Sequence, residues 1–320
     1  MSHDPSSTRT ALRICPLCEA TCGLTLTIEG TRVTGARGDR DDVFSQGFIC
    51  PKGASIGGLD EDPDRLRTPL VRKGGVLTET SWNDAFDAIA RALPAVAEEH
   101  GAQAVGVVLG NPNVHTMAGA LYPSALLAAL RTRSLFTAST LDQMPKHVSS
   151  GLLFGDPNAI RRSGRIELLP APIAADLPRL RGALAARTDP EALVLIGRRH
   201  LRSNNSWMHN VAALTGGSNV CTLQMHPQDA ARLQLADGAA ATVTADGGEL
   251  TAPVEITDCV RTGVVSLPHG WGHSRPGTRM SVAAAQPGVN VNQLLDGTRL
   301  DPLSGTAVLN GIPVTVAPAH

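Results

Sequence analysis

Aromatic residues and clustered positive charge are both scarce in this sequence of 320 residues. Only three Trp, one Tyr and five Phe are present, so the chain has few rings on which bases of single-stranded nucleic acid could stack. The 28 basic residues are balanced by 29 acidic ones, which gives a formal net charge of −1. This balance is not typical of a polybasic surface that binds nucleic acid. We therefore expect no nucleic-acid partner.

Long apolar runs are also lacking. No stretch of about 18 consecutive apolar residues occurs, so the sequence predicts no membrane span. The first twelve residues are polar and contain neither an apolar signal core nor a twin-Arg pair. We expect a cytoplasmic chain. Hydrophobic residues make up 42% and charged residues 18%, which indicates folded domains rather than disorder.

Four of the six cysteines lie within the first fifty residues. Their pattern is C-x2-C-x3-C over Cys15, Cys18 and Cys22, followed after 27 residues by Cys50. A tight loop can present three thiolates to one face, and a distant turn can add the fourth, which suits a 4Fe–4S cluster. A structural zinc site usually has two short Cys pairs, and unrelated thiols are the third alternative. A disulfide scaffold would be shorter and richer in Cys.

The remaining cysteines, Cys221 and Cys259, stand alone, and we expect them to be inert core thiols.

The pattern of apolar residues predicts several local elements. Residues 24–28 and 32–37 form a predicted hairpin with its turn at Glu29-Gly30. Ser81 and Asp84 have the spacing of a helix N-cap, ahead of an apolar stripe that ends near residue 96. Further on, the sequence predicts a buried strand at 104–109, a second strand at 134–138, and helices at 117–130 and 145–154. Strand, helix and strand in this order indicate the start of an α/β domain with a parallel sheet.

The second half of the chain has a different pattern. After a polar joint near residues 156–164, the sequence predicts a helix at 174–186 and a buried strand at 192–196. From residue 221 onward, short strands alternate with Gly-containing turns, for example at 241–243, 254–256 and 264–267. A short helix is predicted at 227–233. This pattern is typical of a compact β-barrel.

The sequence segments around the clustered cysteines resemble those of a known family. ICPLCEATCG at residues 14–23 and GFICPKG at 47–53 resemble the iron–sulfur opening of molybdopterin oxidoreductases, most closely the formate-dehydrogenase-like branch. DPDRL at 62–66, Pro69-Leu70 and Trp82 fit the same pattern. The resemblance implies an α/β plus β fold with three parts. These are a small 4Fe–4S domain at 1–66, an incomplete α/β domain at 67–162, and a molybdopterin dinucleotide-binding domain with a double-psi β-barrel at 163–320.

The resemblance also implies roles for individual residues. Lys52 would lie between the cluster and the pterin and act as an electron relay, the alternative being a solvated surface lysine. In the second half, five segments resemble the loops that face the cofactor. They are LIGRRHLRSNNS at 195–206, HPQDAA at 226–231, LADG at 235–238, PHGWGH at 268–273 and DPLSG at 301–305. The implied cofactor-binding residues are Arg199, His200, Arg202, Ser203, Asn205, His269, Gly270, Trp271 and Asn292; ordinary surface polarity is the alternative for them.

This chain departs from the family pattern in two ways. It is much shorter than members of that family, and the resemblance implies that a dinucleotide-gripping domain is missing near residues 158–163, so that the chain is internally shortened. The protein ligand of the metal should fall within 140–147, where no Cys is present. Asp142 is the hard anionic candidate there; its alternative role is a helix N-cap ahead of Pro145.

By resemblance, we expect a molybdenum- or tungsten-dependent oxidoreductase of formate-dehydrogenase type. Its cofactors would be a 4Fe–4S cluster and molybdopterin guanine dinucleotide, and its partners a small-molecule substrate such as formate and an electron-acceptor protein. One alternative is an internally deleted remnant that binds an iron–sulfur cluster and pterin without turnover. A zinc-stabilised interaction module is another.

Overall fold

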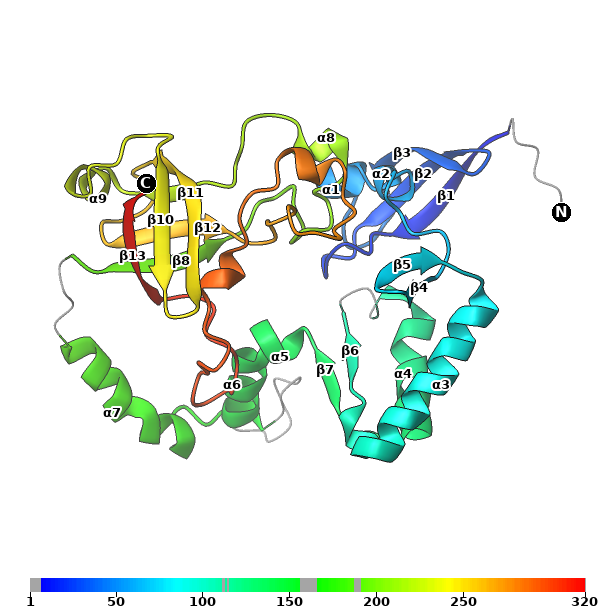
Figure 1. Ribbon diagram of the computed structural model, residues 1–320, viewed down its shortest axis with the longest axis horizontal. Helices are drawn as coiled ribbons and strands as arrows, with labels where there is room; N and C mark the ends of the chain where they lie inside the picture. Colours follow the sequence, from blue (N-terminus) through cyan, green and yellow to red (C-terminus); the bar gives the residue numbers. More distant parts are fainter. Residues whose placement is uncertain (1–6, 111–112, 114, 156–165, 187–190, 320) are drawn as a thin grey trace. The chain divides into compact units, whose positions relative to one another are not determined.

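The computed structural model describes residues 7–110, 113, 115–155, 166–186 and 191–319, except for the side chains of Thr140 and Asp142. Figure 1 shows the secondary structure along the chain. Two compact units are present, Met1–Thr140 and Leu141–His320. No helix formed by the described residues combines the length and apolar character needed to cross a bilayer.

The first unit begins with a three-stranded antiparallel sheet in the order β1-β2-β3. Its strands are β1 (Thr8–Ile14), β2 (Gly23–Glu29) and β3 (Arg32–Gly38). The predicted hairpin is confirmed as β2 and β3, with Gly30 at φ +58° in the turn. Strand β1 had no clear sequence signal, because TRTALRI alternates weakly and all seven of its residues are exposed or partly exposed in the sheet.

Two short helices follow this sheet, α1 (Pro51–Ala54) and α2 (Gly57–Asp60). Both pack against β3. A Cβ atom on Gly57 would lie 2.6 Å from the carbonyl oxygen of Val33, so only glycine permits this close approach. The approach fixes α2 against the sheet.

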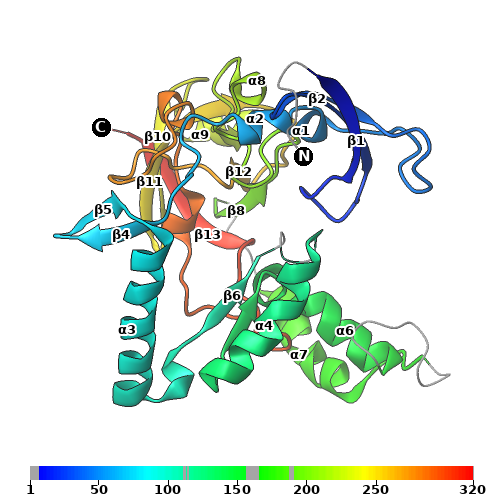
Figure 2. The same ribbon diagram turned by 90° about the vertical axis from the view of Figure 1, so that its right-hand side faces the viewer.

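The rest of the first unit contains two pairs of strands and two long helices. Strands β4 (Leu70–Lys73) and β5 (Val76–Glu79) form a hairpin that leads into α3 (Trp82–His100), as Figure 2 shows. The predicted cap of α3 is confirmed, since the backbone N–H of Asp84 donates to Ser81 Oγ at 3.1 Å. A short 3-10 helix, η1 (Ala102–Ala104), precedes β6 (Val107–Leu109), and α4 (Met117–Leu130) connects β6 to β7 (Leu135–Thr137).

Strands β6 and β7 pair in parallel, with Val107 opposite Leu135. This confirms the predicted strand–helix–strand order, but both strands are shorter than expected. The prediction of a buried strand is wrong, because Val108 is 77% exposed and Phe136 is 51% exposed. A parallel pair becomes buried only when further strands and helices cover it, and the described residues supply two strands to this sheet.

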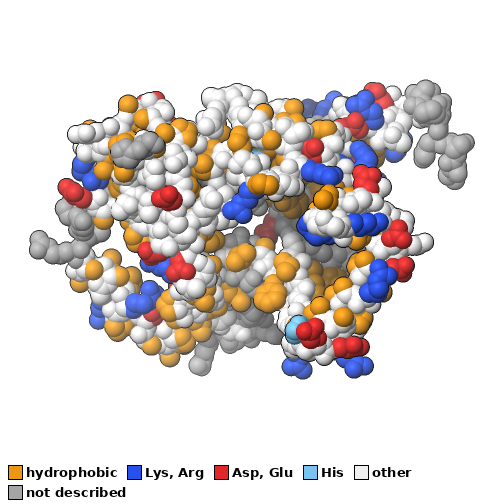
Figure 3. Space-filling view, in the orientation of Figure 1, with side chains coloured by type: hydrophobic (Ala, Val, Ile, Leu, Met, Phe, Trp, Pro, Cys, Tyr) orange, Lys and Arg blue, Asp and Glu red, His pale blue; other side chains and the backbone are white. Residues whose placement is uncertain are grey.

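The helices of this region are also poorly covered. Neither α3 nor α4 has a buried residue, although α4 contains no charged residue. Met117, Leu121 and Tyr122 are 77%, 64% and 72% exposed. Hydrophobic side chains reach the surface between charged ones over α3 (Figure 3). Because a helix that is apolar on every side is normally buried, α4 lacks the packing that would stabilise it.

We therefore expect the amides of α4 to exchange with solvent much faster than those of strand β12 (Val264–Pro268). Local opening costs little free energy where few apolar contacts are broken, and the difference should be about 100-fold in exchange rate. Hydrogen exchange followed by mass spectrometry measures both segments in one sample. Equal protection of α4 and β12 would show that something covers α4.

The second unit is dominated by a closed six-stranded barrel, in the order β10-β11-β9-β12-β8-β13 (Figure 1). Its strands are β8 (Leu193–Arg198), β9 (Leu223–Met225), β10 (Ala240–Ala245), β11 (Gly248–Ile256), β12, and β13 (Ile312–Pro318). Pairs β8–β12 and β9–β11 are parallel, and the other pairs are antiparallel. The predicted barrel is confirmed.

One continuous core fills the barrel. Alternate residues of each strand point inward, including Leu195, Val243, Val254 and Val265, each at most 2% exposed. Helix α9 (Pro227–Arg232) closes one end of the barrel. Its Asp229 carboxylate is 1% exposed and accepts a hydrogen bond from the backbone N–H of Gly263 at 2.7 Å. This buried cap fixes the entry into β12.

The other elements of the chain are short or exposed. They are α5 (Ser139–Asp142), α6 (Met144–Phe154), α7 (Ala171–Ala185), α8 (Ala212–Thr215), η3 (Ala283–Ala285) and η4 (Val291–Leu294). The helices predicted at 145–154 and 174–186 are confirmed as α6 and α7.

Candidate functional site

The sheet of the first unit brings the clustered cysteines together. Cys15 directly follows β1 and Cys22 directly precedes β2, and the pairing of Ile14 with Gly23 places their backbones side by side. The N–H of Cys15 donates to the carbonyl of Cys22 at 2.9 Å, which closes the loop that carries Cys18. Strand pairing therefore converts the C-x2-C-x3-C spacing into a closed three-thiol loop.

The fourth cysteine comes from the segment between β3 and α1. Cys50 is the N-cap residue of α1, and its carbonyl accepts from the N–H of Ala54 at 3.0 Å. A Cβ atom on Gly53 would lie 3.8 Å from Cys15 Sγ. Helix α1 therefore lies directly against the cysteine loop.

The electrostatics show that the four thiols share one site. Burial raises the pKa of Cys15, and the nearby Cys18, Cys50 and Cys22 raise it further. Burial, Cys18 and Cys50 also raise the pKa of Cys22. Thiols with raised pKa values release protons when they bind a metal centre, which couples binding to pH.

Four thiolates are the donor set of a 4Fe–4S cluster. The four thiols that influence one another here, Cys15, Cys18, Cys22 and Cys50, supply that set.

A hydrogen-bonded turn that sequence reasoning missed holds the segment before Cys50. The N–H and Oγ of Ser45 each donate to Asp42 Oδ2 at 2.7 Å, and Ser45 Oγ accepts from the N–H of Gly23 at 3.0 Å. The hydrogen bonds from Ser45 lower the pKa of Asp42. The D-x-x-S spacing was the available signal. This turn joins the 39–50 segment to the start of β2.

Lys52 is a half-buried residue in the first turn of α1, two positions after Cys50. Its position in the chain places it beside the cysteine loop. Its role as an electron relay stays a prediction.

The second unit contains a cavity of about 370 Å³ beside the barrel. Five of the predicted cofactor-binding residues line it: Arg199, His200, Arg202, Ser203 and Trp271. Arg199 and Arg202 are exposed, whereas Ser203 is buried. The lining also contains His209, Leu214, Val220 and Gln286, which sequence reasoning missed. His209 lies only three residues beyond the quoted 195–206 segment, but no local signal distinguished it.

The other four predicted cofactor-binding residues lie outside the cavity lining. His269 bridges two loops, with Nε2 2.6 Å from Asn205 Oδ1 and Nδ1 3.2 Å from the carbonyl oxygen of Arg198. Gly270 has φ +88°, and a Cβ atom there would lie 2.3 Å from the carbonyl oxygen of Asn205. Asn292 is exposed on η4. Thus Asn205, His269 and Gly270 hold the two loops together.

His209, which lines the cavity, is paired with a second buried histidine, His273. His209 Nδ1 and His273 Nε2 are 2.8 Å apart, and the rings of His209 and Trp271 lie 4.2 Å apart between centroids. Burial, followed by the neighbouring His273, lowers the pKa of His209 to about 4. Burial also lowers the pKa of His273. Both imidazoles are therefore neutral near pH 7.

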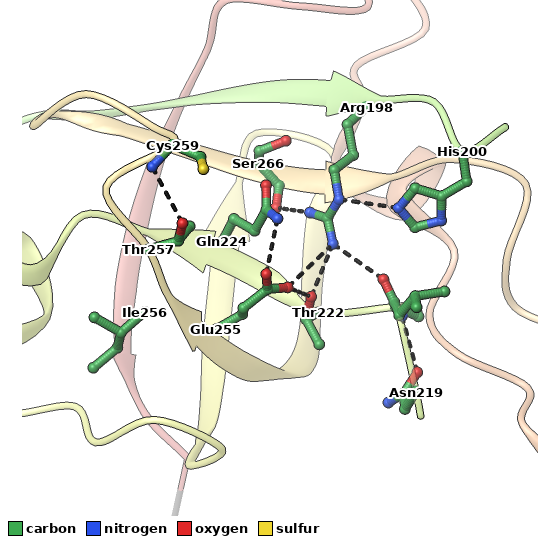
Figure 4. A network of polar contacts seen from close by, with 12 residues as sticks. Arg198, His200, Asn219, Thr222, Gln224, Glu255, Ile256, Thr257, Cys259 and Ser266 are labelled. Carbon is green, nitrogen blue, oxygen red and sulfur yellow. Dashed lines mark hydrogen bonds and ion pairs between the residues drawn. The ribbon is translucent and has the colours of Figure 1, made fainter. Parts of the chain in front are cut away.

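A network around Arg198 fixes the strand that leads into this loop (Figure 4). Arg198 donates to the carbonyl oxygen of Ser266 at 2.6 Å and to Thr222 Oγ1 at 2.8 Å. Glu255 Oε2 lies 3.9 Å from the guanidinium and accepts a short hydrogen bond from Thr222. Burial opposes ionisation of Glu255, but hydrogen bonds from Thr222 and Gln224 and the charge of Arg198 lower its pKa overall.

The same arginine orients His200 at the start of the cavity. Arg198 Nε donates to His200 Nε2 at 3.3 Å. Burial lowers the pKa of His200, and the Arg198 charge lowers it further. The ring is therefore held as a neutral acceptor.

The predicted metal ligand is not placed by the structure. The side chain of Asp142 lies outside the described residues. Its alternative role as the N-cap ahead of Pro145 is wrong, because the N-cap of α6 is Gln143.

Three protein-family models match the chain. The molybdopterin oxidoreductase Fe4S4 domain matches residues 8–59, the molybdopterin oxidoreductase domain matches 65–152, and the molybdopterin dinucleotide binding domain matches 193–313.

Curated relatives match over a limited part of the chain. A nitrate reductase of Symbiobacterium thermophilum is 32% identical over 94 residues, 29% of this chain and 12% of that protein. The alpha subunit of an F420-dependent formate dehydrogenase of Methanocaldococcus jannaschii is 35% identical over 88 residues, 28% of this chain and 13% of that protein. The matched part thus spans about one eighth of the length of these relatives.

A solved structure, acetylene hydratase from Pelobacter acetylenicus, aligns with a TM-score of 0.38 and 20% identity over 52% of this chain and 25% of that chain.

The matched domains make a 4Fe–4S cluster and molybdopterin guanine dinucleotide the cofactors of this chain. Both groups fit the described residues, since four thiols converge beside α1 and an arginine-rimmed cavity lies beside the barrel. The chain belongs to the molybdopterin oxidoreductase family.

Proposed function

We propose that the chain acts as a molybdenum- or tungsten-dependent oxidoreductase of formate-dehydrogenase type, in which electrons pass from the metal–pterin centre to the 4Fe–4S cluster. The observation that carries this proposal is the group of four mutually interacting thiols in a chain that also holds a dinucleotide-binding barrel. Two relatives named as formate dehydrogenase alpha subunits support formate as the substrate. An electron-acceptor protein would complete the path.

The proposal gives a task to several residues. Cys15, Cys18, Cys22 and Cys50 hold the cluster, and Lys52 lies next to Cys50 along α1. Arg199 and Arg202, exposed at the cavity, provide cations for a diphosphate. When bound, the cofactors supply two-electron chemistry at the metal and one-electron transfer at the cluster. Asp142 remains the candidate protein ligand of the metal.

We keep the three-part division at 1–66, 67–162 and 163–320, with a double-psi barrel in the last part. Support for the double-psi connectivity comes from the two parallel pairs, β8–β12 and β9–β11, within a barrel whose other pairs are antiparallel. The matched domains at 8–59 and 193–313 fall within the first and third parts, and the one at 65–152 begins two residues before the second part.

The second candidate function is a remnant that binds cofactor without turnover. One observation favours it. Among the described residues between the cysteine loop and the barrel, one pair of strands is parallel, and helices α3, α4 and α6 have no buried residue. A metal centre needs ligands held in fixed geometry by packed surroundings. An uncovered α/β layer would bind pterin weakly and oxidise little or no formate.

Elemental analysis of anaerobically purified full chain tests the proposal. Iron, acid-labile sulfide and molybdenum or tungsten, together with dye-linked formate oxidation, are the expected result. Iron and sulfide without turnover would favour the remnant. Zinc without sulfide would contradict both and favour a zinc-stabilised module.

A further inference from the structure

We propose that Ser45 and Asp42 form a latch that holds Cys50 in place as the fourth ligand, and that the Asp42 carboxylate makes the bound cluster harder to reduce. Both residues act through the ligands and neither is a ligand itself, so they are positioning residues. The inference rests on the proposed function, in which the four thiols hold the cluster that receives the electrons.

The four thiols come from two separate segments that must be held together. Three lie on the three-thiol loop between β1 and β2, and Cys50 follows the 39–49 segment that leaves β3. Burial of large apolar side chains does little to hold that segment, because Val43, Phe44 and Phe48 are 76%, 83% and 66% exposed. Polar contacts therefore decide from where the fourth thiol is presented.

Gly23, directly after the three-thiol loop, is where the two segments meet. Its backbone N–H donates to Ser45 Oγ at 3.0 Å, and its carbonyl oxygen accepts from the N–H of Asp39 at 2.9 Å. Both backbone groups of this buried residue are thus bound to the 39–49 segment. A Cβ atom on Gly23 would lie 2.5 Å from Asp42 Cβ, so the contact requires glycine.

The hydroxyl of Ser45 connects this contact to the rest of the segment. It donates to Asp42 Oδ2 at 2.7 Å, and the N–H of Ser45 donates to the same oxygen at 2.7 Å. Two backbone bonds extend the turn, from Gln46 to the carbonyl of Asp42 at 3.0 Å and from Phe48 to the carbonyl of Ser45 at 2.8 Å. The bonds reach to within two residues of the fourth cysteine. Without the hydroxyl, the N–H of Gly23 would lose its acceptor.

The start of α1 holds the other side of Cys50. A Cβ atom on Gly53 would lie 3.0 Å from Ile49 Cγ1 and 3.8 Å from Cys15 Sγ. Cys50 therefore lies between two anchors, the latch at Gly23 and the packing of α1 against Cys15. Groups that orient metal ligands contribute strongly to metal retention, so removing the latch should weaken the hold on one iron.

The latch also places a negative charge next to the three-thiol loop. Hydrogen bonds from Ser45 lower the pKa of Asp42, so its carboxylate is ionised near pH 7. Burial raises the pKa of Cys22, as do Cys18, Cys50 and, to a smaller extent, Asp42. Reduction adds one negative charge to a cluster, and a nearby carboxylate opposes that charge. Asp42 should therefore lower the reduction potential.

Ferricyanide oxidation of the reconstituted full chain tests the positioning role. Ferricyanide accepts one electron from the 4Fe–4S cluster while one Fe²⁺ leaves, and the 3Fe–4S product has its own electron paramagnetic resonance signal. We expect Ser45→Ala to lose this iron about tenfold faster than the wild type. Ser45→Thr keeps the hydroxyl and should restore most of the wild-type rate. Ser81→Ala is the matched control, because Ser81 also accepts one backbone N–H in the same unit, and it should leave the rate unchanged.

Redox titration of Asp42→Asn tests the charge effect. Asn keeps an oxygen that can accept from Ser45 but carries no charge. The variant should retain wild-type iron and sulfide, and its reduction potential should shift to a more positive value. Asp84→Asn is the matched control, because Asp84 also accepts from a hydroxyl, that of Thr80, but lies on α3. This control should keep the wild-type potential.

The results can separate the inference from the proposed function. Circular dichroism identifies any variant that fails to fold, and if Ser45→Ala is one of them, Ser45→Thr and Asp42→Asn still decide. A wild-type rate in Ser45→Ala, or the same acceleration in Ser81→Ala, would overturn the positioning role. An unchanged potential in Asp42→Asn would overturn the charge effect. A wild-type chain that takes up the cluster but oxidises no formate would contradict the proposed function alone, and one that takes up neither iron nor sulfide would overturn both.

Discussion

Replacing Cys18 with Ser is expected to abolish the broad visible absorption of the 4Fe–4S cluster and to lower bound iron and acid-labile sulfide to near zero. Cys18 lies in the loop closed by Cys15 and Cys22, and serine supplies no thiolate for the fourth corner. Cys18 is exposed, so the substitution removes a ligand without leaving a cavity in the core. Visible spectroscopy and chemical analysis after anaerobic reconstitution measure the effect.

Cys259→Ser is the matched control for this experiment. Cys259 is also exposed, so the expectation of a core thiol is wrong for this residue. It lies after β11 in the other unit, where its backbone N–H donates to Thr257 Oγ1 at 3.1 Å. The control should keep full iron and sulfide content. A Cys18→Ser protein that retains the wild-type spectrum would exclude Cys18 as a ligand. One bound zinc and no sulfide in the wild type would exclude the cluster altogether.

Replacing Arg198 with Met is expected to destabilise the barrel unit by about 3 kcal/mol. The Arg198 side chain is 15% exposed and satisfies the carbonyl oxygens of Ser266 and Val220 as well as Thr222 Oγ1. Met fills a similar volume but donates no hydrogen bond, so these three acceptors lose their donor. Glu255 keeps the hydrogen bonds from Thr222 and Gln224 but loses the nearby positive charge. Urea unfolding followed by circular dichroism measures the change in free energy of unfolding.

Arg261→Met is the control for the loss of a positive charge. Arg261 is exposed in the turn before β12, and a surface change of this kind should alter stability by less than about 0.5 kcal/mol. We also expect Arg198→Met to weaken ligand binding in the cavity, because His200 loses its donor from Arg198 Nε. Equal stability of the two variants would show that the network contributes nothing to the barrel.

Local signals in the sequence were reliable where the contacts are local. The cap of α3 joins residues only three positions apart, Ser81 and Asp84, and it was predicted correctly. The β2–β3 hairpin depends on a two-residue turn at Gly30. Helix α4 runs over the predicted residues, Met117 to Leu130, with Thr116 as its N-cap. In each case the residues that decide the structure are close neighbours in the chain.

Sequence-based predictions failed where contacts with a distant part of the chain decide whether a strand forms or is buried. Strand β1 has a weak pattern of its own and exists because all of its residues pair with β2. The strand at Val107–Leu109 has the apolar sequence of a buried strand, yet Val108 is 77% exposed. Burial depends on how many other strands and helices cover the sheet, and no pattern within a strand contains that information.

The candidate sites divide in the same way. The spacing of the four cysteines and the sequence segments around them were enough to identify the cluster-binding motif and the family. Ligand type and ligand spacing are properties of the sequence. Closure of the cysteine loop by β1–β2 pairing was decided by the tertiary structure. So was the pairing of His209 with His273, which lie 64 positions apart. Hydrogen-bond geometry between distant segments depends on the register of the barrel strands that carry them, and that register arises only when the whole barrel closes.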